Sequence, residues 1–149
     1  MKSYKYLFIL FAALPIPSVF SQTTEPGSEN HSEKVKAHAL RIKYGESRTQ
    51  KEHKIHSEAI GKQLDSAVLE HQEEKKKIPR KYRNRVEKHN LTIDKQHSEA
   101  KKHHNALSEE LRKEKHNEYA VRHHANKIHA SMEKAEKEKM EVKTKTESP

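Results

Sequence analysis

The sequence predicts an all-α protein of elongated helices, with a partial coiled coil, a kink near Pro79 and no globular core. The chain of 149 residues is 36% charged and 31% hydrophobic, whereas globular domains are about 25% charged and about 45–50% apolar with glycine included. It contains no cysteine, so disulfides cannot replace a missing core. Between residues 31 and 142 the strong helix breakers are Gly45, Gly61 and Pro79, and nearly all other residues there tolerate a helix.

The first 21 residues predict a secretory signal peptide. Lys2 and Lys5 precede an uninterrupted apolar run over 7–14, and Ser21 ends a segment with the small-residue pattern of a cleavage site. The apolar run is far shorter than the roughly 20 residues that cross a bilayer. We therefore predict cleavage after Ser21 and secretion of the remaining chain into the extracellular space.

Two acceptor sequences for N-glycosylation follow in the chain that would be exported. Asn30-His31-Ser32 and Asn90-Leu91-Thr92 both match the pattern Asn-x-Ser/Thr. Asn30 and Asn90 are therefore candidate glycosylation sites. A sugar on Asn90 has to point away from any contact between helices.

Four segments follow the signal peptide. Residues 22–31 are polar and contain proline and glycine, which predicts a disordered leader. Residues 32–78 are expected to form one or more helices, and Pro79 ends or kinks the helix because it lacks a backbone donor and clashes with the preceding turn. Residues 80–142 are expected to form a single long helix, and residues 143–149 a disordered tail.

An apolar residue recurs at almost every seventh position of the long helix, which is typical of a coiled coil. The members of this apolar stripe are Val86, Ile93, Ala100, Leu107, Val121, Ile128 and Ala135. Glu114 interrupts the stripe, and the companion row four residues later contains polar side chains such as His97 and His104. Because only half of a coiled-coil interface is present, we expect the helix to form a homo-oligomer or to lay the stripe on another protein or a membrane.

The 13 histidines are the unusual chemical feature of the composition. Two imidazoles on one helix bind a metal ion together when they are four, or at least three, residues apart. One pair has such a spacing, His53 and His56, which makes these two residues weak candidate ligands. We therefore predict neither a specific metal site nor a cofactor.

Histidine also changes charge within the physiological pH range. His97 and His104 lie on the companion row, where protonated imidazoles would repel each other across an oligomer contact. Acidification to endosomal pH is therefore predicted to loosen self-association and to strengthen attraction to anionic membranes.

A segment with seven cations and no acid spans residues 75–85. Its cations are Lys75, Lys76, Lys77, Arg80, Lys81, Arg83 and Arg85. In an exported protein such a run favours anionic lipid or a glycosaminoglycan as the partner, and we expect no nucleic-acid partner. A solubilising loop around Pro79 is the alternative interpretation.

Motifs for catalysis are absent from the sequence. It has no cysteine nucleophile, no Gly-x-Ser-x-Gly turn and no glycine-rich phosphate loop. A solvated helix also offers no cleft in which carboxylate pKa values could be driven apart. We predict that the protein is not an enzyme.

Two segments of the chain resemble the helical repeats of the stathmin family. Lys54–Leu64, with the sequence KIHSEAIGKQL, and the EHQEEK run of Glu70–Lys75 resemble the first repeat, and Lys115–Lys134 is similar to the second. The resemblance covers about residues 50–141, and no recognisable regulatory-serine segment precedes it. Because of the signal peptide, the chain looks most like the secreted stathmin-like immunomodulators of parasitic flatworms. That resemblance implies oligomerisation, membrane association and damping of host immune signalling.

These observations predict a secreted, non-enzymatic helical effector. It is expected to self-associate, to bind cell surfaces, anionic membranes or a protein partner on a target cell, and to modulate immune signalling. A secreted structural protein or histidine-rich carrier or matrix protein is the alternative. A tubulin-binding stathmin-like protein is the second alternative, although stathmins act in the cytosol and the signal peptide argues against tubulin as the partner.

Overall fold

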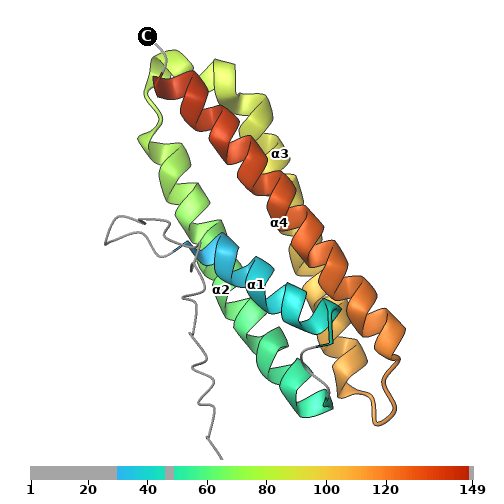
Figure 1. Cartoon of the computed structure of the whole chain (residues 1–149). Helices are drawn as coiled ribbons and strands as arrows, with labels where there is room; N and C mark the ends of the chain where they lie inside the picture. Colours follow the sequence, from blue (N-terminus) through green and yellow to red (C-terminus); the bar gives the residue numbers. More distant parts are fainter. Residues whose placement is uncertain (1–29, 46–48, 148–149) are drawn as a thin grey trace, which may run out of the picture.

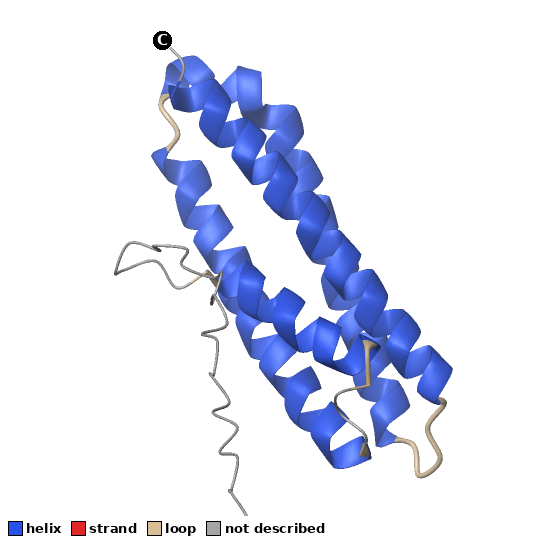
Figure 2. Ribbon diagram, viewed as in Figure 1, coloured by secondary structure: helices blue, strands red, loops and turns tan. Residues whose placement is uncertain are grey.

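The protein is an antiparallel bundle of four helices in a computed structural model that describes residues 30–45 and 49–147 (Figures 1 and 2). The helices are α1 (His31–Lys43), α2 (Gln50–Lys77), α3 (Arg80–Arg112) and α4 (Glu118–Glu147). The described residues contain no strand, so the predicted all-α class is confirmed. The signal peptide and most of the leader lie outside the described residues.

Side chains that accept hydrogen bonds from backbone amides fix the starts of three helices. The Asn30 side chain accepts from the amide of Glu33 at 3.1 Å, so α1 begins at His31, the last residue of the predicted leader. Thr49 and Glu52 form a reciprocal capping box at the start of α2. The Asn117 side chain accepts from the amides of Tyr119 and Ala120, at 3.0 and 3.2 Å, and caps α4.

Pro79 separates two helices that lie side by side. Helix α2 ends at Lys77, as the proline predicts, and α3 begins at Arg80. Ser57 Oγ lies 3.1 Å from Ser108 Oγ, and Gln72 donates to Asp94 at 3.0 Å, so the two helices run antiparallel. The chain therefore reverses at Pro79, where a kink was predicted.

The predicted single helix over 80–142 is wrong. Helix α3 ends at Arg112, residues 113–117 form a loop, and α4 runs back along α3 (Figure 1). The interruption of the apolar stripe, Glu114, lies in this loop. Asn117 then restarts the helix as a cap. Helix α4 also continues to Glu147, so the predicted disordered tail is helical up to that residue.

The prediction of no globular core is also wrong. Every member of the apolar stripe is buried, because α3 and α4 pack against each other, α2 covers part of α3, and α1 covers part of α4. The core cluster consists of Val35, Ala39, Ile42, Ile60, Leu64, Ala67, Ala100, Leu107, Leu111, Val121, Ala125, Ile128 and Met132. A bundle of four helices needs only a narrow apolar face on each helix, so a charge-rich composition is compatible with a core.

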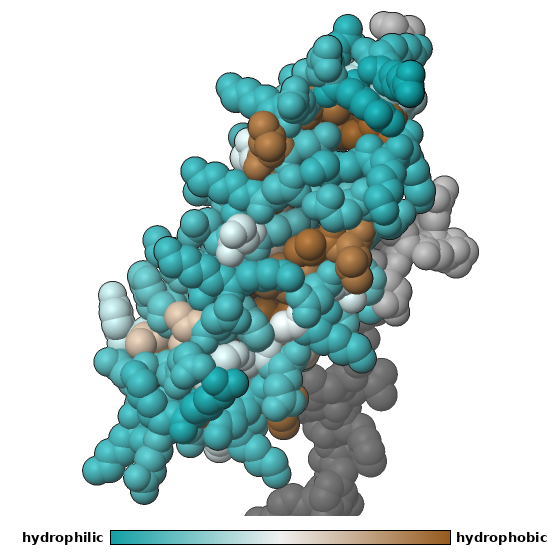
Figure 3. Space-filling model, turned by 180° about the vertical axis from the view of Figure 1, so that it is seen from behind, coloured by the Kyte–Doolittle hydropathy of each residue, from teal (hydrophilic) through white to brown (hydrophobic). Residues whose placement is uncertain are grey.

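Helix α1 is less than half as long as the other helices and packs against α2 and α4 over one half of the bundle (Figure 1). The core cluster lies in that half. Of the described residues, those of α2, α3 and α4 form the other half, and a cavity of about 510 Å³ opens there, with Ile78, Ile93 and Val142 among the residues that line it. The face seen from behind is mostly hydrophilic with a few separate apolar patches (Figure 3).

Candidate anion-binding surface

The seven cations predicted to bind an anionic partner lie together at the α2–α3 turn, at one end of the bundle (Figure 1). Six of them are exposed, and we call this group the basic end. It comprises Lys76, Lys77, Arg80, Lys81, Arg83 and Arg85. Three lysines occupy the last turn of α2, where unpaired helix carbonyls favour positive charge.

Two contacts within the turn fix its shape and leave most of its charge available. The half-buried Lys75 donates to Asp94 of α3 at 2.7 Å, and Arg83 Nε donates to the carbonyl of Ile78 at 3.1 Å. Within the described part of the chain, Lys77, Arg80, Lys81 and Arg85 form no ion pair. These four cations therefore face solvent without an acidic partner.

Apolar and aromatic groups lie next to these cations. Lys81 Nζ lies 4.6 Å from the centroid of the Tyr82 ring, and the guanidinium of Arg85 lies 5.9 Å from it. A groove of about 570 Å³ beside the turn is lined by Lys75, Lys76, Arg83, Asn90 and Leu91, among others. Leu91 is 61% exposed. The surface therefore combines cations with apolar area, which suits an anionic amphiphile.

The two candidate glycosylation sites lie in different surroundings. Asn30 is exposed, and its Oδ1 caps α1. A sugar is attached to the side-chain nitrogen, so glycosylation of Asn30 is compatible with the cap. Asn90 is half-buried and lines both the groove and the cavity of about 510 Å³ next to the basic end. A sugar on Asn90 would therefore occupy space beside the basic end.

The two histidines predicted to sense pH lie inside the bundle. His97 is 4% exposed, and its ring lies edge-to-face against the ring of His71 on α2, with 5.6 Å between centroids. Burial, followed by the charge of His71, lowers the pKa of His97 to about 4. His104 is half-buried, with Nε2 2.8 Å from the carbonyl of Ser57. Both rings contact other helices of the same chain.

Most histidines contact another histidine from a different part of the chain, a pattern that the spacing within one helix did not reveal. The pairs are His38 with His56, His53 with His116, His71 with His97, and His103 with both His123 and His124. Burial lowers the pKa of His38, His71, His97, His103 and His124. For all of these except His71, repulsion from a neighbouring histidine is the next cause.

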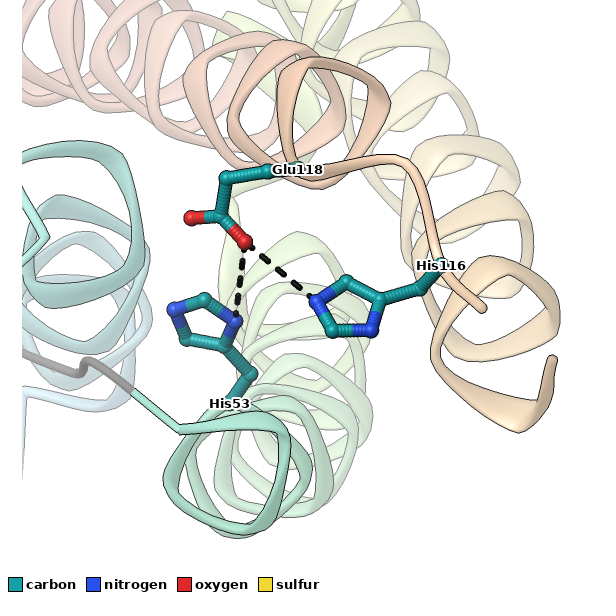
Figure 4. A group of neighbouring side chains, drawn as sticks. All are labelled: His53, His116 and Glu118. Carbon is teal, nitrogen blue, oxygen red and sulfur yellow. Dashed lines mark ion pairs between the residues drawn. The ribbon is translucent and has the colours of Figure 1, made fainter. Parts of the chain in front are cut away.

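The weak candidate ligands His53 and His56 lie in different groups. His56 Nδ1 is 3.0 Å from Nδ1 of His38 on α1. His53 instead faces His116 in the α3–α4 loop and Glu118 at the start of α4 (Figure 4). His53 and His56 therefore do not face a common metal position. His53 instead faces His116 and Glu118, which the sequence analysis did not predict as ligands.

Comparison with protein-family models, with curated proteins and with solved structures finds no match to this chain. The resemblance to stathmin-like proteins therefore stays a prediction. Among the described helices, none has a stretch that is both apolar and long enough to cross a bilayer.

Proposed function

We propose that this protein is an exported, non-enzymatic helical bundle that binds anionic surfaces of a target cell through its basic end. The observation that carries the proposal is the group of six exposed cations at one turn, in a segment with no acid. Two sources share the required chemistry, namely the headgroups of anionic lipids and the sulfates of a glycosaminoglycan. Leu91 and Tyr82 beside the cations favour lipid, because a bilayer also accepts apolar side chains.

The proposed cellular consequence is modulation of immune signalling in the cell that the protein contacts. Self-association at the membrane is also part of the proposal, but the apolar stripe cannot be the surface that mediates it. The apolar stripe is covered within the chain, so a dimer would have to use another surface. The carrier or matrix alternative differs because it requires no binding that depends on ionic strength.

Neutralising the basic end is expected to abolish binding to anionic vesicles. Each basic residue near an anionic membrane contributes about 1 kcal/mol, so a variant with Lys77, Arg80, Lys81 and Arg85 all changed to Gln should lose about 4 kcal/mol and bind roughly 1000-fold more weakly. Co-sedimentation with vesicles containing phosphatidylserine measures the change, and a heparin column tests the sulfated-glycan source. Binding by the unmodified chain should fall steeply as salt is raised.

The matched control neutralises four exposed lysines elsewhere, Lys51, Lys54, Lys102 and Lys127, and changes net charge by the same amount. It should keep most of the binding, because the proposal depends on where the charge lies. The proposal would be contradicted if both variants lost vesicle binding to the same extent, or if vesicle binding by the unmodified chain did not change with salt concentration.

A further inference from the structure

We propose that His53, His116 and Glu118 form a binding site for a divalent transition-metal ion, with Zn²⁺ as the ion of best fit. His53 comes from the start of α2, whereas His116 at the end of the α3–α4 loop and Glu118 at the first residue of α4 are two positions apart (Figure 4). Within the described residues this is the one group in which three such donor atoms all lie within 4.8 Å of one another. The site is at the end of the bundle opposite the basic end and does not depend on the proposed function.

The spacing of the donor atoms fits a tetrahedral ion. Glu118 Oε2 lies 3.3 Å from Nε2 of His116 and 3.8 Å from Nδ1 of His53. Zinc bonds to nitrogen and oxygen of about 2.0–2.2 Å at tetrahedral angles place neighbouring donors about 3.3–3.6 Å apart. The two imidazole nitrogens lie within 4.8 Å of each other, so side-chain rotations that shorten this distance would bring all three atoms onto one ion.

The donors are held in place by contacts outside the group. Arg122 Nε donates to Oε1 of Glu118 at 2.9 Å, which leaves Oε2 directed at the two imidazoles. The Asn117 amide donates to Glu110 Oε1 at 2.6 Å and fixes the loop between His116 and Glu118. His53 is 1% exposed and follows the capping box of α2 by one residue. A preorganised site of this kind needs little ordering when the ion binds.

The choice of ion follows from the donors. Two imidazole nitrogens and one carboxylate oxygen suit Zn²⁺, whereas Mg²⁺ and Ca²⁺ prefer sites made of oxygen alone. Three protein ligands leave a fourth position for water. The bound ion would also tie the start of α2 to the α3–α4 loop, so it should stabilise the folded chain.

Titration of the full chain with Zn²⁺ alone tests the proposal, with His116→Ala as the variant and His123→Ala as its matched control. His116 lies in a loop and His123 is exposed on α4, so both substitutions spare the core. Calorimetry should show that the tightest site binds one Zn²⁺ per chain. His116→Ala should lower the affinity of that site by roughly tenfold or more, because it removes one of three ligands. His123→Ala should leave it unchanged.

A second readout separates the site from adventitious binding by the other histidines. Zn²⁺ should raise the melting temperature of the unmodified chain and of His123→Ala, but not of His116→Ala or Glu118→Gln. Circular dichroism without metal shows whether each variant is folded. If either His116→Ala or Glu118→Gln does not fold, the other of these two ligand variants carries the test. The proposal is overturned if the tightest Zn²⁺ event survives in His116→Ala, if His123→Ala weakens it equally, or if no stoichiometric event occurs.

Discussion

Acidification from pH 7 to pH 4 is expected to destabilise the folded chain by about 3 kcal/mol through His97 alone. His97 is buried, which lowers its pKa. Repulsion from the charges of His71, Lys139 and Lys101 lowers the pKa further, whereas Asp94 raises it. The pKa of His97 falls from its ordinary 6.5 to about 4 in the folded chain. Each pKa unit corresponds to about 1.4 kcal/mol, which gives the expected loss.

The direction follows from proton binding. Below pH 6.5 the unfolded chain protonates this histidine while the folded chain holds it neutral, so protons favour unfolding. The contribution of His97 to the free energy of unfolding is therefore fully present above pH 6.5 and is lost as the pH falls toward 4. His38, His71, His103 and His124 have lowered pKa values as well, so their contributions carry the same sign.

Urea unfolding followed by circular dichroism across this pH range measures the effect, and His97→Leu tests its origin. Neither ring nitrogen of His97 has a hydrogen-bond partner among the described residues. Leucine should therefore raise the free energy of unfolding at pH 7.5 by about 1–2 kcal/mol and flatten the pH profile. His123→Ala is the surface control, and it affects only the smaller contributions of His103 and His124, whose pKa values the charge of His123 helps to lower. An unchanged profile in His97→Leu, or an equally flattened profile in His123→Ala, would rule out this origin.

Truncation of the core is expected to have the other large effect. Leu107 of α3 is fully buried in the core cluster, so Leu107→Ala should lower the free energy of unfolding by about 2–5 kcal/mol. That loss is comparable to the whole stability of a small domain. Chemical denaturation measures it.

Leu91→Ala is the matched control because it makes the same substitution on the same helix at a site that is 61% exposed. Its effect should stay within about 0.5 kcal/mol. An elongated helix without a core would give two small and similar effects, so that result would count against the bundle.

The helices and their buried face could be predicted from local sequence, but the reversal after Arg112 could not. Leu107, Glu114 and Val121 are seven residues apart, although Glu114 lies in the loop between α3 and α4. The loop has a length that keeps the seven-residue spacing in phase across the reversal. Periodicity therefore indicated one helix where there are two. The polar Glu114 and the cap Asn117 were the local signs of a break.

The core was missed for a related reason. Composition counts apolar residues over the whole chain, whereas a narrow bundle needs only the few on each inner face. Buried histidines such as His53, His71 and His97 fill the remaining interior positions, and composition counts them as polar.

The two candidate sites differ in how much the sequence reveals. The basic end is continuous in sequence, so it was visible as a run of cations. His53 joins His116 and Glu118 only because the chain folds back between α2 and α4. The local sign was a His-x-Glu pattern at the start of α4, and its third member is distant in sequence.

The chain folds back on itself between α3 and α4, and one distance between these two helices tests this reversal most directly. The chain has no cysteine, so Lys88→Cys and Glu141→Cys place two spin labels at exposed positions without side reactions. His89 contacts Glu138 at 2.6 Å and Lys145 at 2.6 Å, so the two labelled positions lie side by side in the bundle. With unlabelled chain in excess to remove contacts between molecules, we expect a distance of about 20–30 Å, from the interaxial spacing of packed helices plus the labels. A distance of about 80 Å, which 1.5 Å per residue gives for an unbroken helix, would contradict the bundle.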